Sequence, residues 1–219
     1  MTKAVLSLGG SVINDGTINT VFLASLRRLS AADCAIVTGG GRTARNYITA
    51  ARALGLSEYD GDLLGIKATE LNALFISLIL DWPLAKDLEE ARRLKSGFVM
   101  GGTIPGISTD MDSVLVAEAV GAKRMVNITR IGRLYDREPT LPEAKPLKAL
   151  TYEEMERMAY EHDQRMAGTH FPVDLVAVRL AKRAHIEIHV VGPDIDEIEH
   201  AIKGLKHNGT VIGRHRPSE

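Results

Sequence analysis

The sequence predicts an α/β protein whose largely parallel sheet is covered by helices on both faces. Short apolar runs alternate along the chain with stretches in which apolar residues recur every three or four positions. This alternation is typical of strand–helix units, which build parallel sheets buried on both faces. Glycine clusters at 9–10, 39–41 and 101–102 each follow an apolar run. Ligands in such folds bind beyond the carboxyl ends of the strands, where these glycines would lie.

The elements can be placed in chain order from the same patterns. Apolar runs predict strands at 4–8, 34–38, 98–100, 124–129, 186–191 and 210–212. Helical periodicity predicts helices at 21–29, 42–54, 62–80, 110–120, 173–182 and 195–203, and another that begins at Thr151 with Glu154 at capping-box spacing. Gly55 is a candidate C-cap for the second of these helices. No internal repeat or long linker divides the sequence, so we expect one domain with two lobes over residues 1–219.

The composition excludes several classes of function. In 219 residues, 27 Lys and Arg nearly balance 28 Asp and Glu, giving a net charge of −1, so we expect no broad basic surface for nucleic acid. The one cysteine, Cys34, cannot form a disulfide within the chain, which favours a reducing, cytoplasmic compartment. We expect no secretory leader and no membrane span, because the run at 4–8 ends in glycine and the run at 71–80 is too short.

The first glycine cluster is a candidate phosphate site. Gly9 and Gly10 end the first predicted strand, and Ser11 adds a hydroxyl donor beside them. Successive backbone N–H groups in such a turn can bind an anion. A short glycine pair can equally be only a tight turn, so both interpretations stay open here.

The second cluster, at 39–41, opens directly into a predicted helix. A helix N-terminus carries partial positive charge and free N–H groups, which suit phosphate. Arg42 and Arg45 lie at the start of this helix, where their charge opposes the helix dipole. A bound phosphate gives a reason for both arginines, because guanidinium groups match phosphate oxygens.

A third loop, at 100–110, combines three glycines, a proline and three hydroxyl residues ahead of a helix. Backbone N–H groups and hydroxyls of this kind suit a nucleotide base or sugar. Ser108, Thr109 or Asp110 can be the N-cap of the helix. Asp110 can also orient a cation or a metal-bound phosphate, and the sequence leaves both roles open.

The chain has neither a G-x-x-x-x-G-K-S/T P-loop nor a G-x-G-x-x-G dinucleotide motif. Several separate phosphate-binding turns in one α/β chain therefore favour a phosphoryl-transfer enzyme of another design. We predict no metal site built from side chains. The nearest candidates, His162, Asp163, His170 and Asp174, match no standard zinc spacing.

These turns, taken with several further segments, resemble the amino-acid kinase superfamily, and within it the archaeal type of UMP kinase. The resemblance runs from Lys3 almost to the end of the chain, and the order and spacing of the segments carry it. The matching segments are SLGGSV at 7–12, TGGGRTARNYI at 38–48, DLLGI at 62–66, Asn72 with Ala73, residues 100–110, the strand ending at Thr129, Tyr135 with Pro139, and NGTVI at 208–212.

The resemblance implies a three-layer α/β/α fold with a mostly parallel central sheet. It implies transfer of the γ-phosphoryl group of ATP to UMP with Mg²⁺, a step of pyrimidine nucleotide synthesis. The N-terminal part would be mainly the acceptor lobe and the C-terminal part mainly the ATP lobe. The same resemblance implies a homohexamer, assembled as a trimer of dimers.

Site residues also follow from the resemblance. Asp110, Gly10 and Arg45 are the expected catalytic residues. The expected ATP site comprises Gly9, Gly10, Ser11, Gly40, Arg45, Thr129, Tyr135 and Glu138. The expected UMP site comprises Gly39, Asp62, Ile104, Pro105, Gly106, Ile107, Ser108, Thr109 and Asp110, with Asp62 at the ribose.

Some positions depart from the usual superfamily pattern and motivate alternatives. Ile104 and Ile107 stand where archaeal members often carry histidine, which motivates a kinase of the same fold for another small phosphate or carboxylate. Ser7 stands where many members carry lysine, and residues 130–134 replace an acid with two arginines. These changes motivate a nucleotide-binding protein that has lost catalysis.

Overall fold

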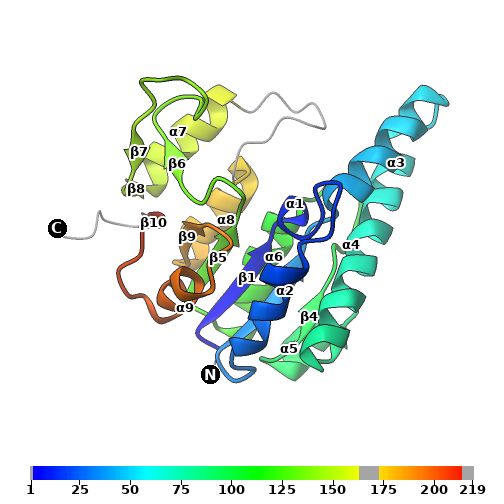
Figure 1. Cartoon of the computed structure of the whole chain (residues 1–219), viewed down its shortest axis with the longest axis horizontal. Helices are drawn as coiled ribbons and strands as arrows, with labels where there is room; N and C mark the ends of the chain where they lie inside the picture. Colours follow the sequence, from blue (N-terminus) through cyan, green and yellow to red (C-terminus); the bar gives the residue numbers. More distant parts are fainter. Residues whose placement is uncertain (1, 163–172, 214–219) are drawn as a thin grey trace.

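The computed structural model describes residues 2–162 and 173–213, which fold around an eight-stranded sheet (Figure 1). The strand order is β3-β4-β2-β1-β5-β9-β10-β8. Neighbouring strands run parallel except for β9 and β10, which are antiparallel. A separate two-stranded sheet pairs β6 with β7. The predicted mostly parallel sheet is therefore confirmed.

The bounds of the elements are as follows. The strands are β1 Ala4–Leu8, β2 Cys34–Thr38, β3 Leu84–Ala85, β4 Val99–Met100, β5 Arg124–Ile128, β6 Leu134–Tyr135, β7 Pro146–Leu147, β8 Ala149–Thr151, β9 Glu187–Val191 and β10 Thr210–Gly213. The helices are α1 Gly10–Ile13, α2 Thr20–Ser25 with a 3-10 turn Leu26–Arg28, α3 Gly41–Ala53, α4 Glu58–Leu80, α5 Leu88–Leu94, α6 Thr109–Val120, α7 Tyr152–His162, α8 Leu175–Ala184 and α9 Ile195–Lys203.

Helices cover both faces of the sheet. The strand β1 is buried along its whole length and alternates between the two sides: Leu6 and Leu8 belong to the apolar cluster that includes residues of α1, α2, α4 and α9, whereas Val5 belongs to the cluster that includes residues of α5, α6, α7 and α8. Because both faces are covered, the central strands read as continuous apolar runs. The three-layer α/β/α arrangement is thus confirmed.

Several boundaries differ from the sequence-based prediction for local reasons. The helix α4 begins at Glu58 because Ser57 and Asp60 form a capping box that precedes the apolar stretch. The short helix α5, capped by Asp87, was not predicted, since its largely charged sequence carries little apolar periodicity. The capping box between Thr151 and Glu154 is confirmed by two hydrogen bonds of 3.1 and 2.8 Å.

The long helix α4 packs against α3, and the pair stands at one side of the molecule (Figure 1). By length and composition α4 could cross a membrane, with a mean hydropathy of 1.7 over its most apolar window, of which 33% is buried. The helix predicted at 62–80 is thus four residues longer at its start, whereas the expectation of no membrane span rested on the shorter apolar run at 71–80. The core helix of a non-membrane protein passes the same test, so the observation is weak evidence of a span.

Candidate active site

The first two glycine turns touch each other through their backbones. They follow the paired parallel strands β1 and β2, whose last residues, Leu8 and Thr38, lie side by side. A Cβ atom at Gly10 would lie 1.9 Å from the Gly41 nitrogen, and one at Gly39 would lie 2.6 Å from the Gly10 nitrogen. Only glycine permits this approach. The two turns therefore form one continuous backbone surface at the carboxyl ends of the strands.

The turn after β1 also meets the end of β5. The Gly9 N–H donates to the Ile128 carbonyl at 3.1 Å, and a Cβ at Gly9 would lie 2.8 Å from that oxygen. Thr129 follows directly and accepts a hydrogen bond from Gly132 N–H at 3.0 Å. The structure thus brings Thr129 beside the glycine turns.

One buried face of α4 holds both the second turn and the third loop. Asn72 Nδ2 donates to the Gly39 carbonyl at 2.7 Å. One turn earlier, Thr69 Oγ1 accepts from the Gly102 N–H at 2.7 Å. Thr69 was not predicted as a site residue, and Asn72 appeared only as part of the matching pattern. Two polar residues three positions apart on the buried side of an apolar helix were the available signal.

Aspartate side chains on α4 and α6 also anchor the loop between β4 and α6. Asp62 Oδ2 accepts from the Gly106 N–H at 2.9 Å, so the predicted ribose ligand lies against the predicted acceptor loop. The buried Asp112 accepts from the Thr103 N–H at 3.2 Å and from its hydroxyl at 2.6 Å. Burial raises the pKa of Asp112, and the hydrogen bonds from Thr103 oppose that rise. Asp112 was not predicted as a site residue from the sequence.

The structure decides the N-cap of α6 in favour of Ser108, whose hydroxyl accepts from the Met111 N–H at 3.1 Å. Asp110 is therefore free of the capping role and faces β1, where the Ser7 hydroxyl donates to its Oδ1 at 2.7 Å. Within this loop, Ile104 is 59% exposed. Gly106 is also exposed, whereas Pro105, Ile107 and Thr109 are half-buried.

The carboxyl group of Asp110 has an unusual environment. Desolvation raises its pKa to about 7, the hydrogen bond from Ser7 lowers it, and the negative charge of Asp174 raises it further. Asp174 is the N-cap of α8 and accepts a hydrogen bond from Ser108, so the starts of α6 and α8 meet here. A carboxyl group with such a pKa, close to the carboxyl end of the central strand β1, is a candidate functional group.

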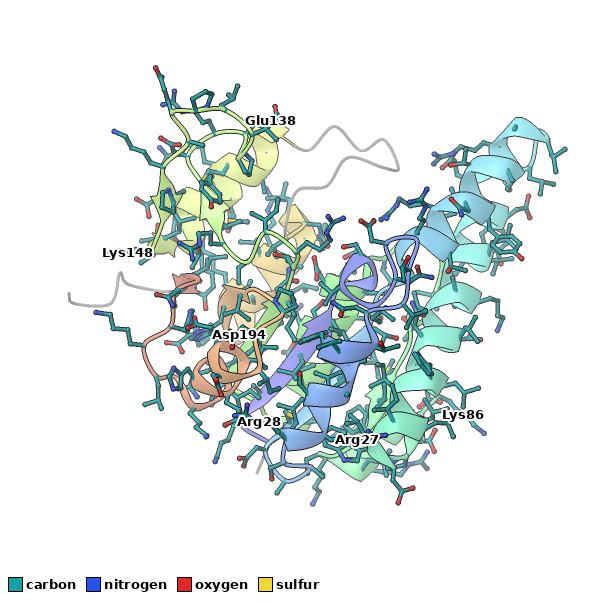
Figure 2. The ribbon with its side chains drawn as sticks, viewed as in Figure 1. Arg27, Arg28, Lys86, Glu138, Lys148 and Asp194 are labelled. Atoms are coloured by element: carbon teal, nitrogen blue, oxygen red, sulfur yellow. The ribbon has the colours of Figure 1, made fainter. Side chains whose placement is uncertain are left out.

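The remaining predicted ATP residues are divided between two places. Arg45 pairs with Asp15 at 3.5 Å, beside the glycine turns, and Ser11 lies within the short helix α1. Tyr135 belongs to the small β6–β7 sheet, and Glu138 lies exposed on the loop between those strands, away from β1 (Figure 2). No described hydrogen bond links either side chain to the glycine turns.

Among the described residues, no group of three or more His, Cys, Asp and Glu side chains could hold a metal ion. Of the histidine cluster considered from the sequence, Asp163 and His170 lie outside the described residues, as does the side chain of His162. Asp174 serves as a helix cap.

Comparison with known proteins identifies the family of this site. A model of the amino acid kinase family matches residues 92–192. The uridylate kinase of Thermoplasma acidophilum is 34% identical over 219 residues, 95% of each chain. The chain belongs to the amino acid kinase family. The uridylate kinase of Methanopyrus kandleri is 36% identical over 95% of this chain and 98% of its own, so the resemblance noted in the sequence is confirmed.

Solved structures agree with the fold of this amino acid kinase. The uridylate kinase of Archaeoglobus fulgidus superposes with a TM-score of 0.82 at 31% identity, covering 97% of this chain and all of the other. The UMP kinase of Bacillus anthracis gives a TM-score of 0.76 at 20% identity, with 97% and 96% coverage, which shows the shared fold alone.

Proposed function

We propose that this amino acid kinase transfers the γ-phosphoryl group of MgATP to UMP, giving ADP and UDP in pyrimidine nucleotide synthesis. The observation that carries the proposal is the backbone contact between the turns at Gly10 and Gly39, beside an acceptor loop anchored by Asp62 and Thr69. Adjacent N–H-rich turns suit a polyphosphate chain. The names of the relatives, uridylate kinase, support UMP as the acceptor.

The chemistry asks the protein for positioning and charge stabilisation. A phosphate oxygen of UMP attacks the γ-phosphorus, and a new P–O bond forms. The bond between the γ-phosphorus and the β,γ-bridging oxygen breaks, and its electron pair leaves with ADP. No general base is required, because the attacking oxygen is already an anion. Mg²⁺ is usually bound through substrate phosphates and one or two carboxylates, and it would neutralise charge here.

We assign the donor to the β1, β2 and β5 ends. Gly9, Gly10, Ser11 and Gly40 would cradle the triphosphate, and Arg45 would pair with it. The pocket for the adenine base would be lined by Thr129, Tyr135 and Glu138. Two of these residues belong to the β6–β7 hairpin, so this separate small sheet would form part of the pocket. Backbone N–H groups and a guanidinium preorganised in this way stabilise a phosphoryl-transfer transition state electrostatically.

We assign UMP to the β4 side of the same surface. Gly39 and Asp62 would hold the nucleotide, with the carboxylate at the ribose. Loop residues 104–110 would surround the uracil and the acceptor phosphate. Asp110 would lie where donor and acceptor meet, because it reaches β1 through Ser7 while belonging to the acceptor loop.

Release of ADP, measured with MgATP against UMP, CMP, AMP and isopentenyl phosphate, tests the proposal. We expect rapid turnover with UMP and slow turnover with the others. Preferred turnover of another acceptor would overturn UMP and favour a sister activity, for which the 59% exposed Ile104 would be the first residue to change. No ADP release with any acceptor, together with thermal stabilisation of the protein by ATP, would favour a nucleotide-binding protein without catalysis.

We also propose that the enzyme assembles with copies of itself, as a hexamer built from dimers. The helix α4 supports self-association, because it presents exposed apolar side chains along one stripe: Leu63, Leu71, Leu74, Phe75 and Leu78. A contiguous apolar surface of this kind is typical of a protein or membrane contact. Covering it with a second α4 would remove it from water.

Light scattering of the wild type and of a Leu71→Glu, Leu78→Glu variant tests the assembly. We expect a hexamer for the wild type and smaller species for the variant, with Val21→Glu, another exposed apolar site, as the control. A monomeric wild type that sediments with lipid vesicles would instead assign the stripe to a membrane.

We place the enzyme in the cytoplasm. Cys34 is a free, buried thiol in β2, and desolvation raises its pKa to about 12. A chain with one protonated, buried cysteine forms no disulfide within itself, so an oxidising compartment would not stabilise its fold. Recovery of the protein from a membrane or secreted fraction would contradict this assignment.

A further inference from the structure

Asp15 joins two arginines that are far apart in the sequence. Its carboxylate pairs with Arg45 from α3 at 3.5 Å and, through the other oxygen, with Arg130 from the loop after β5. Arg42 Nη1 donates to the backbone carbonyl of Asp15 at 3.2 Å. Three guanidinium groups thus converge on one short loop, residues 14–17, which follows α1. We call Arg45, Asp15 and Arg130 the arginine bridge.

The arginine bridge spans three central strands at their carboxyl ends. The sheet order places β2, β1 and β5 side by side. Arg45 stands on the helix that follows β2, Asp15 on the loop that follows β1 and α1, and Arg130 two residues beyond the end of β5. The arginine bridge therefore lies across the carboxyl ends of these strands, where the glycine turns also lie.

The loop that carries Arg130 begins with a tight, well-packed turn. Thr129 and Gly132 close a tight turn through a 3.0 Å hydrogen bond around Arg130. Gly132 has φ of +76°, and a Cβ there would lie 2.8 Å from the nitrogen of Gly192. The turn is packed directly against the end of β9, so backbone contacts fix the main chain at residue 130, while the side chain of Arg130 is held by Asp15.

The charges of the arginine bridge do not balance. Among the described residues, Asp15 is the one carboxylate that pairs with Arg45 or Arg130, and Arg42 pairs with a carbonyl alone. Two positive charges of the bridge therefore face one negative charge, and Arg42 adds a third positive charge beside them. The side chain of Arg130 is 59% exposed and that of Arg45 is 35% exposed, so both can reach a ligand. An anion with several oxygens would complete this arrangement.

We propose that Arg130 is a further phosphate-binding residue for the donor, and that Asp15 holds Arg45 and Arg130 until the polyphosphate takes its place. This inference rests on the proposed function. The ligand class is a nucleoside triphosphate rather than a monophosphate acceptor, because Arg130 lies on the β5 side of the glycine turns and the acceptor loop follows β4 on the opposite side. Arg130 stabilises charge on the β- and γ-phosphates and leaves the acceptor site alone.

Calorimetric binding of ATP, AMP and UMP to four proteins tests the assignment. The proteins are the wild type, Arg130→Ala, Asp15→Asn and, as the matched control, Arg133→Ala, which removes the same charge from the same loop. Arg130→Ala should weaken ATP binding by roughly tenfold or more, as expected for lost charge-assisted hydrogen bonds. Its affinity for AMP and UMP should stay within about twofold of the wild type.

Asp15→Asn breaks the same ion pair but keeps Arg130, and it should bind ATP at least as tightly as the wild type. Arg133→Ala should match the wild type for all three ligands. Unchanged ATP binding by Arg130→Ala, an equal loss for ATP and AMP, or a loss in Asp15→Asn as large as in Arg130→Ala would each overturn the inference. A wild type that binds no ATP would overturn the proposed function as well.

Discussion

The side-chain amide of Asn72 donates a 2.7 Å hydrogen bond to the carbonyl oxygen of Gly39. Thr69, one helical turn earlier, accepts from Gly102 at the same distance. Both residues are buried, with 6% exposure each. One rigid helix therefore sets the separation between the glycine turn at 39–41 and the loop proposed for UMP.

Asn72→Ala is expected to lower the free energy of unfolding by about 1–3 kcal/mol, because the buried carbonyl of Gly39 loses its donor. The KM values for UMP and ATP should both rise, since Gly39 is proposed to hold UMP and the next residue, Gly40, to hold the triphosphate. Urea unfolding and steady-state kinetics measure the two effects. Lys67→Ala on the same helix removes only a surface pair with Glu70 and should cost at most about 0.5 kcal/mol. Equal effects of the two variants would contradict this reading.

Gly10→Ala is expected to abolish nucleotide binding and to destabilise the fold by about 3 kcal/mol, the upper end of overpacking costs. The added methyl group would meet the backbone of residue 41, which cannot rotate away. Gly55→Ala is the control. Gly55 has φ of +78° with no atom within 4 Å of a Cβ, so it should cost about 1–2 kcal/mol and leave binding intact. Calorimetric titration with ATP distinguishes the two sites, and normal ATP binding by Gly10→Ala would refute the close contact.

Asp110→Asn should lower kcat strongly while leaving the fold intact, because Asn still accepts the hydrogen bond from Ser7. The folded pKa of Asp110, about 7, lies above its ordinary value of 3.8. The folded state then binds more protons than the unfolded state between those values, so Asp110 makes stability fall as pH rises from about 4 to about 7. Thermal unfolding across this range should show a flatter pH profile for the variant. Matching profiles would contradict the raised pKa.

His207→Gln should reduce the loss of stability in mild acid. His207 Nε2 lies 2.8 Å from His189 Nδ1, and His207 Nδ1 accepts from the Gly209 N–H. Burial, followed by the nearby His189, lowers the pKa of His207 from 6.5 to about 4. The unfolded state therefore binds the extra proton first, and stability falls as pH drops from about 6.5 towards 4. Identical acid profiles for the wild type and His207→Gln would reject this cause.

The parts of the fold that depend on local pattern could be predicted from the sequence. The strand at Ala4–Leu8 and the cap at Thr151 are set by neighbouring residues, so periodicity and spacing found them. The place of β10 between β9 and β8 could not be found in this way. Its partners, such as Val190 for Thr210, come from distant segments, and no local pattern specifies which pair forms.

The candidate site divides along the same line. Glycine clusters can be recognised in the sequence because they interrupt an apolar run, and the family resemblance supplied their expected roles. The supporting residues Asp112 and Asp15 were missed, since each is an ordinary charged residue until the fold sets its partner, Thr103 or Arg130, against it. The side chains that hold the glycine turns and the loop in place were therefore harder to predict from the sequence than the turns themselves.

The position of β8 at the edge of the sheet also bears on how the chain folds as it is synthesised. Its sheet neighbour is β10, which the ribosome makes about sixty residues later. The strands β1 to β5 pair with one another and can associate while synthesis continues, although one side of β5 still waits for β9. Residues 149–151 must wait for 210–213, a long-range closure of the kind that slows folding. The half of the sheet bearing the acceptor loop is therefore expected to mature first, with the β8 edge closing last.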